Sequence, residues 1–287
     1  RIGYETGLLW LYPPTILPLL APFGLVSYGA AKAVWLALGF ASLALGGALA
    51  GRGERAMGAI AAVSPAAWAL AFTGQLSALF ALAMLVGLLF AKTRPVLAGI
   101  CIGLLTLKPQ FGALVPVFLI AVGAWRAAAV GAATTLCLIV TALTFVGAEP
   151  FVGFLHSLTG THSHFTAMGG NPGRITLNES LSSLGVSAPT LIVFLLPLLA
   201  AAGCIFFLAA RGAPFVLLVA FVLLSSCAAS PYFWNYDFAV VVFALMLIAT
   251  HVRLFTKSTH LLFTALWFAP LLPYTYDHSF FTPTLWL

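Results

Sequence analysis

The sequence predicts an all-α protein whose helices cross a membrane many times, and its composition and the length of its apolar segments are the reasons. Hydrophobic residues make up 62% of the 287 positions and charged residues only 6%, whereas a soluble domain carries about 25% charged residues. Apolar segments close to the roughly 20 residues that a helix needs to cross a bilayer recur along the chain. A membrane β-barrel would need polar and apolar residues to alternate, and residues 191–201 are apolar on every side.

Apolar length, taken together with the flanking charges, places about ten candidate spans in the chain. They lie at residues 28–50, 56–73, 75–91, 95–109, 111–125, 127–147, 189–210, 213–230, 237–252 and 259–273. No repeat of fixed period and no linker divides the sequence. The whole chain, 1–287, is therefore interpreted as a single transmembrane domain.

The apolar segment 8–26 is interpreted differently because it contains four prolines. Each proline removes a backbone donor, and within hydrocarbon a neighbouring group must replace the lost hydrogen bond. We expect a short helix lying along the outer surface of the membrane. The alternative is a true span, which would move Tyr12 to the inner face, away from the other polar motifs.

The net charge of +6 does not indicate nucleic-acid binding, because the twelve Lys and Arg residues are scattered singly or in pairs between apolar segments. Short cytoplasmic loops are enriched in Lys and Arg. Alternation of the spans places eight of these residues inside: Arg52, Arg55, Lys92, Arg94, Arg126, Arg211, Arg253 and Lys257. The remaining four lie outside or near the outer boundary: Arg1, Lys32, Lys108 and Arg174.

No metal or cofactor is predicted. The four cysteines lie within apolar stretches without a metal-binding spacing, and His162 and His164 have no nearby Cys or acidic residue to complete a ligand set. The sequence contains no phosphate-binding loop and no dinucleotide motif. Energy coupling by a nucleotide is therefore not expected.

Polar side chains near hydrocarbon are costly, so those that persist generally face a cavity or a partner. Gln75 lies in a predicted outer turn, where it either caps the turn or donates to a sugar or phosphate oxygen. Lys108 and Gln110 flank a proline at the outer boundary. Lys108 either extends to the membrane surface or binds a phosphate oxygen.

The longest stretch without a predicted span, 148–188, is placed outside and is rich in polar groups. Arg174 is able to hold a phosphate through two hydrogen bonds. Asn178 and Glu179 either cap a helix or accept from sugar hydroxyls. In a further outer cluster, Tyr232 belongs either to an interfacial aromatic belt or to the site, and Asp237 either caps a helix or serves the site.

Five groups of motifs occur in an order that resembles glycosyltransferase family 87, a family of multi-spanning enzymes in the GT-C superfamily. They are Leu11-Tyr12-Pro13-Pro14 followed by Ala33-Val34-Trp35; Gly74-Gln75; Leu107-Lys108-Pro109-Gln110; Asn178-Glu179-Ser180; and Ser230-Pro231-Tyr232 with Tyr236-Asp237. None of these motifs is specific alone, and the resemblance covers roughly residues 10–250. It implies a GT-C type helical fold and a substrate-binding role for the residues of the motifs.

The resemblance also implies an activity, which is transfer of a hexose or pentose from a polyprenyl-phosphate donor. The acceptor is a lipid-linked or cell-envelope molecule, the partners include membrane lipids but no nucleic acid, and the location is the external face of a bacterial plasma membrane. In the family, the catalytic base is an aspartate upstream of the Tyr-Pro-Pro motif. Because Glu5 is the one acid before Tyr12, we expect the base, the first span and the first external loop to lie upstream of Arg1. The alternative is a degenerate copy that lacks the base. Glu179 departs from the family's more frequent Asn-Gln-Ser.

Two other functions remain open at this point. A transporter or lipid flippase would place its charges near the membrane midplane on broken helices. A non-catalytic scaffold subunit would show the same spans without a polar pocket. If the protein is a transferase, Lys108 and Arg174 are the cations expected to stabilise the departing phosphate. Asp237 is expected to orient the acceptor or the pocket.

Overall fold

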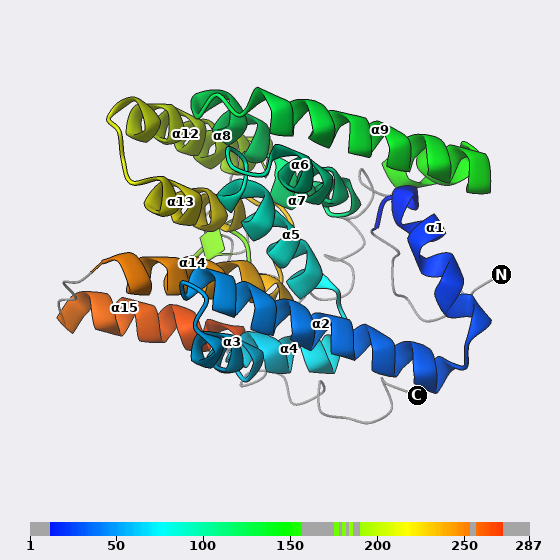
Figure 1. Cartoon of the computed structure of the whole chain (residues 1–287), viewed down its shortest axis with the longest axis horizontal. Helices are drawn as coiled ribbons and strands as arrows, with labels where there is room; N and C mark the ends of the chain where they lie inside the picture. The colour runs from blue at the N-terminus through cyan, green and yellow to red at the C-terminus, as the bar shows by residue number, and fades with distance from the viewer. Residues whose placement is uncertain are drawn as a thin grey trace.

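The computed structural model describes residues 12–156, 175–177, 180–181, 184–185, 190–252 and 257–271, and over these ranges the chain is helical without a strand (Figure 1). The prediction of an all-α fold is confirmed for this part of the chain. In order, the elements are η2 (Pro14–Ile16), α1 (Leu17–Leu20), η3 (Ala21–Leu25), α2 (Tyr28–Ala50), α3 (Arg55–Ala62), α4 (Pro65–Thr73), α5 (Ser77–Leu89), α6 (Pro95–Leu104), η4 (Leu105–Leu107), α7 (Pro109–Gly112), α8 (Val115–Ala121), α9 (Trp125–Val146), α12 (Thr190–Ala210), α13 (Phe215–Ala228), η5 (Asn235–Phe238), α14 (Ala239–His251), α15 (Lys257–Phe268) and η6 (Ala269–Leu271).

Three of the described helices are long and apolar enough to cross a membrane: α2, α9 and the Ile192–Ala210 part of α12. The pair α3 and α4, bent by 50° at the break between them, makes a fourth if it is counted as one span. The predicted segments coincide with helices or with consecutive helices, but many of these are short, so about ten crossings are not confirmed. The apolar helices nevertheless indicate a membrane protein.

Prolines explain several of the short helices. Pro65, Pro95 and Pro109 each occupy the first turn of a helix, where the missing N–H is not needed. The same residues would break a helix in its interior. Segments that read as continuous apolar runs are therefore divided into α3 and α4, or into η4 and α7.

The segment formed by η2, α1 and η3 runs crosswise to α2 and α9, near one end of both (Figure 1). The three pieces together cover Pro14–Leu25. Its position on the membrane surface stays a prediction.

Glycines allow α6 and α9 to pack in close contact. A Cβ atom added at Gly99 would lie 2.5 Å from the Cβ of Val130, and one at Gly103 would lie 2.4 Å from the Cβ of Thr134. Small residues four positions apart let helix backbones approach, as is common in membrane proteins. Gly99 meets Val130 and Gly103 meets Thr134, so the residue numbers of the two helices increase in the same direction. The helices α6 and α9 therefore run parallel and begin at the same end.

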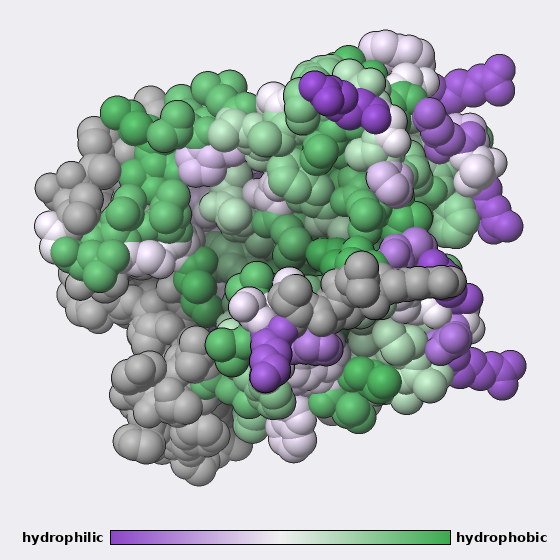
Figure 2. Space-filling model, turned by 90° about the vertical axis from the view of Figure 1, so that its left-hand side faces the viewer, coloured by the Kyte–Doolittle hydropathy of each residue, from purple (hydrophilic) through white to green (hydrophobic). Residues whose placement is uncertain are grey.

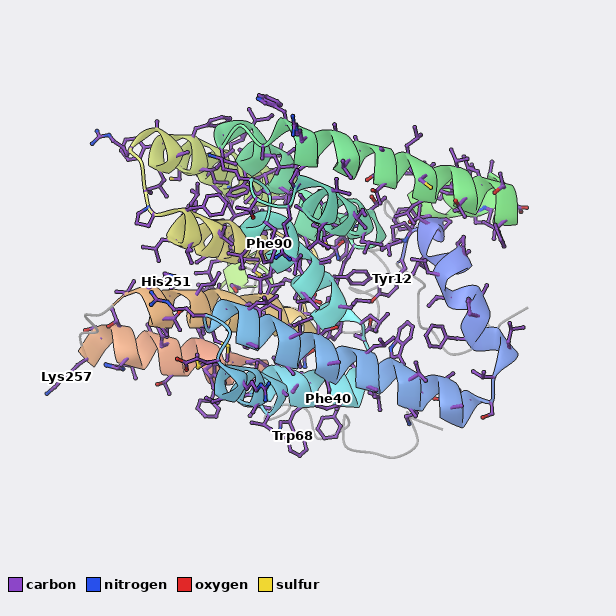
Figure 3. The ribbon with its side chains drawn as sticks, viewed as in Figure 1. Tyr12, Phe40, Trp68, Phe90, His251 and Lys257 are labelled. Atoms are coloured by element: carbon purple, nitrogen blue, oxygen red, sulfur yellow. The ribbon has the colours of Figure 1, made fainter. Side chains whose placement is uncertain are left out.

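The interhelical contacts define two ends of the bundle. The starts of α5 and α14 lie together, and the Thr250 hydroxyl donates to the Ala50 carbonyl at 3.1 Å, so α2 and α14 also finish together. The end of α5 and the end of α2 therefore lie away from the starts of α5 and α14. Because α6 follows α5 and runs parallel to α9, the connection that precedes α9, after α8, lies at this same end. Figure 3 shows His251 and Lys257 together at one end, away from Tyr12.

The end that holds these connections is called the basic end. Its described cations are Arg52, Arg55, Lys92, Arg94, Arg126, Arg211 and Lys257. Figure 2 shows hydrophilic residues along the right-hand edge of its view and a few that face the viewer, whereas most of the remaining described surface is hydrophobic. These cations lie together at one end of the bundle, as their predicted placement on one side of the membrane requires. Arg1, Arg174 and Arg253 lie outside the described residues.

Candidate functional site

The candidate site lies at the starts of α5 and α14, on the side of the core away from the basic end. Gly74 ends α4 in a left-handed conformation (φ 63°) that favours glycine, and its N–H donates to the Leu70 carbonyl at 2.9 Å. Gln75 follows in this turn, and α5 then starts at Ser77. Lys108 separates η4 from α7.

A buried ion pair forms the centre of the site. The Nζ atom of Lys108 contacts Oδ1 of Asp237 directly and also donates to the Ser77 hydroxyl at 2.8 Å. The same hydroxyl donates to Oδ1 of Asp237 at 2.6 Å. Lys108 is 5% exposed and Asp237 0%. Removing either charge would leave the other buried and uncompensated, so the two residues depend on each other.

The backbone and two aromatic rings complete the surroundings of the pair. Oδ2 of Asp237 accepts from the N–H of Trp234 at 3.1 Å, so both carboxylate oxygens receive hydrogen bonds. The Lys108 ammonium lies 4.9 Å from the ring centroid of Phe111 and 5.1 Å from that of Tyr236, within cation–π range. These contacts hold the ammonium in one position.

Tyr12 connects the N-terminal segment to the site. Its hydroxyl donates to Oε1 of Gln75 at 2.5 Å, and its ring packs 6.5 Å from that of Phe80. Burial, and secondarily the negative charge of Asp237, raises the pKa of the Tyr12 hydroxyl well above its ordinary value of about 10. The phenol therefore stays neutral and remains a donor in the folded protein. Gln75 and Tyr12, from two separate motifs, are brought together.

The remaining predicted site residues divide into two groups. Gln110 in α7 and Tyr232 are half-buried, and the backbone N–H of Tyr232 donates to the Ser230 hydroxyl at 3.2 Å. Three others lie outside the described residues: Arg174, Asn178 and Glu179. The chain immediately after Arg174 does reach the site, because the N–H of Ile175 donates to the Phe233 carbonyl at 2.7 Å.

Sequence reasoning placed Lys108 and Asp237 in one site, but it did not predict that they form an ion pair, and it did not assign Ser77 as the bridge between them. A signal for the pair was present, because a cation between apolar segments requires an opposite charge and few acids lie within such segments. No comparable signal pointed to Ser77. Serines are common in turns before helices, and the bridging role depends on two elements distant in sequence.

The arrangement is suited to holding a polar ligand beside an apolar phase. It offers a fixed ammonium, a hydroxyl, a phenol and an amide close to one another. Within the described ranges, no group of three or more His, Cys, Asp or Glu side chains is placed to hold a metal ion. The expectation that the sequence holds no metal site stays a prediction.

The apolar helices indicate a membrane protein, and a buried polar cluster lies where several of these helices begin. The chain belongs to glycosyltransferase family 87, whose sequence profile matches residues 10–231. The family predicted from the motifs is thereby confirmed, and the protein is a glycosyltransferase. The matched region includes Tyr12, Gln75 and Lys108 and ends before Asp237. No curated protein and no solved structure matches the chain.

Proposed function

We propose that this glycosyltransferase moves a hexose or pentose from a polyprenyl-phosphate donor to a lipid-linked or cell-envelope acceptor. The enzyme would act at the external face of a bacterial plasma membrane, with about ten crossings once the short helices are included. One observation carries the proposal: the cluster of Lys108, Asp237 and Ser77 lies at the end of the helices opposite the basic end. Cations of cytoplasmic loops would then occupy the inner face.

The chemistry of such a transfer fits a boundary site. A polyprenyl chain stays in hydrocarbon while its phosphate lies at the membrane surface, so the reacting atoms meet there. As the bond between the anomeric carbon and the phosphate oxygen breaks, negative charge develops on the leaving phosphate, and fixed positive groups stabilise it. The acceptor hydroxyl loses its proton to a general base as it attacks the anomeric carbon.

Lys108 and Arg174 are proposed to stabilise the leaving phosphate. Asp237 and Ser77 hold the Lys108 ammonium in place, so it does not need to reorganise during the reaction. Because both oxygens of Asp237 already accept hydrogen bonds, we assign Asp237 to orientation. The base is still expected upstream of Tyr12, as the family resemblance implies.

Tyr12, Gln75, Gln110, Asn178, Glu179 and Tyr232 are proposed to bind the sugar or acceptor hydroxyls. A transporter is less well supported, because transporters are often built from inverted repeats and the sequence shows no internal repeat. Membership of a glycosyltransferase family also favours the transferase.

The proposal is tested by sugar transfer in reconstituted membranes. The full-length protein in nanodiscs receives radiolabelled polyprenyl-phosphate mannose or polyprenyl-phosphate arabinose, with an envelope lipid extract as acceptor. We expect a labelled lipid or glycan product from one of these donors and none from a soluble nucleotide sugar. Product formed only from the nucleotide sugar would overturn the donor assignment.

Variants test the assigned roles. Lys108→Ala and Arg174→Ala should each abolish most transfer, while exposed Lys92→Ala at the basic end should leave it unchanged. Full activity in both of the first two variants would remove the phosphate role. Thermal unfolding of each variant separates a lost role from a lost fold.

A further inference from the structure

A groove lies next to the polar cluster, where η3, α2 and α4 meet. It encloses about 690 Å³, within the 300–1,000 Å³ typical of ligand pockets. Its lining residues are mostly apolar or aromatic: Leu20, Phe23, Tyr28, Ala31, Lys32, Trp35, Leu36, Ala71, Phe72, Thr73 and Gly74. A groove of this composition suits a hydrocarbon chain.

Trp35 fixes the wall of the groove closest to the site. Its indole N–H donates to the Gly74 carbonyl at 2.6 Å, and its ring packs edge-to-face against Phe23 with centroids 5.4 Å apart. Gly74 lines the groove, and the next residue, Gln75, accepts the hydrogen bond of Tyr12. The groove therefore runs up to the polar cluster.

Lys32 is the one charged residue among the lining residues. Its side chain is exposed, and among the described residues it makes no ion pair or hydrogen bond. It lies in the second turn of α2, beyond the first turn where the helix dipole acts. Its uncompensated ammonium favours an anionic ligand.

Lys108 differs from Lys32 because its charge has a partner. Its charge is already balanced by Asp237, and its side chain is almost completely buried. Lys32 offers an uncompensated charge to a ligand that arrives from the lipid phase.

We infer that this groove binds the polyprenyl chain of the donor and that Lys32 pairs with the donor phosphate before the reaction. The chain lies along Phe23, Trp35 and Phe72, and the phosphate is held at the end of the groove that adjoins Gln75. This inference rests on the proposed transferase function. It divides the work between two cations, because Lys32 anchors the donor and Lys108 acts on the leaving phosphate.

Photo-crosslinking tests the inference directly. The protein in phosphatidylcholine nanodiscs is irradiated with a polyprenyl monophosphate that carries a diazirine in its chain, and labelled peptides are identified by mass spectrometry. We expect labels at residues 28–36 and 71–74. Lys32→Gln should reduce labelling about tenfold, the effect of losing a charge-assisted hydrogen bond, and Lys32→Arg should restore it. Lys92→Gln, at an exposed position of the basic end, is the matched control.

A second lipid distinguishes the donor from ordinary membrane lipid. Phosphatidylglycerol with the same diazirine should label the groove weakly and without dependence on Lys32. Equal labelling by the two probes would overturn the inference in favour of a general lipid contact. Absence of labels from both peptides would also overturn it.

Kinetics separate failure of this inference from failure of the proposed function. With the donor found active in the transfer assay, Lys32→Gln should raise the donor KM about tenfold with little change in kcat. Transfer with an unchanged donor KM would reject the groove and retain the transferase. Lys32-dependent labelling without transfer from any polyprenyl-phosphate sugar would retain the groove and reject the proposed donor reaction.

Discussion

Two neighbouring regions of the α6–η4–α7 segment are held in place by different physical means. In α6, Gly99 and Gly103 pack against α9 through close contacts between backbones and small side chains. Just beyond η4, Lys108 is held by a buried ion pair and a serine hydroxyl. The first region is specified by the absence of side-chain atoms and the second by charge. The site is therefore anchored by a polar network, while the helix that supports it is positioned by close packing.

The largest expected effect comes from breaking the ion pair. Lys108→Met or Asp237→Leu should each lower the free energy of unfolding by about 3–5 kcal/mol, because the opposite charge stays buried without a partner. The double variant should recover most of this loss, since apolar residues of similar volume replace both charges. Unfolding in detergent micelles by circular dichroism measures the three differences.

The double variant also separates folding from function. It should fold and remain without transfer activity, since the proposed phosphate-stabilising ammonium is gone. Losses that simply add in the double variant would show that Lys108 and Asp237 do not depend on each other. Wild-type activity in the folded double variant would exclude a chemical role for the pair.

The glycine contact should respond to a single added carbon. Gly103→Ala should destabilise the protein by about 1–3 kcal/mol, because the new methyl group would meet Thr134 at 2.4 Å. Gly203→Ala is the matched control, since this helical glycine has no atom within 4 Å of an added Cβ. The control should be neutral or more stable by about 0.5–1 kcal/mol. Equal effects at the two positions would contradict the close packing of α6 on α9.

The smallest effect is expected at Tyr12. Tyr12→Phe keeps the ring beside Phe80 and removes the hydrogen bond to Gln75, so the free energy of unfolding should fall by about 1 kcal/mol. Tyr28→Phe, at an exposed position, should change it by less than about 0.5 kcal/mol. Denaturant unfolding at neutral pH measures both changes.

The Tyr12 contribution should also depend on pH. Folding raises the pKa of this phenol through burial, so its stabilising effect is complete below pH of about 10 and is lost as the pH rises further. The stability difference between wild type and Tyr12→Phe should therefore shrink above pH of about 10. A difference that stays constant across this range would show that folding does not raise the pKa of Tyr12.

Much of the site could be predicted from single positions in the sequence. Gln75 and Lys108 interrupt apolar segments, and a polar group in that setting needs a partner wherever the chain folds. Their partners were not predicted, because Lys108 and Asp237 are 129 positions apart and no local periodicity relates them. The groove near Lys32 was also missed, since it depends on how η3 packs against α2 and α4.

By itself, the sequence determined the helical class, the apolar character, the family and the grouping of cations at one end. These properties follow from composition, from the spacing of polar residues and from motifs that lie within short stretches. The tertiary structure alone decided which helices are short, how α6 meets α9 and which cation is neutralised. The physical reason is that these outcomes depend on contacts between elements distant in the chain, where the fit of one surface against another selects the partners.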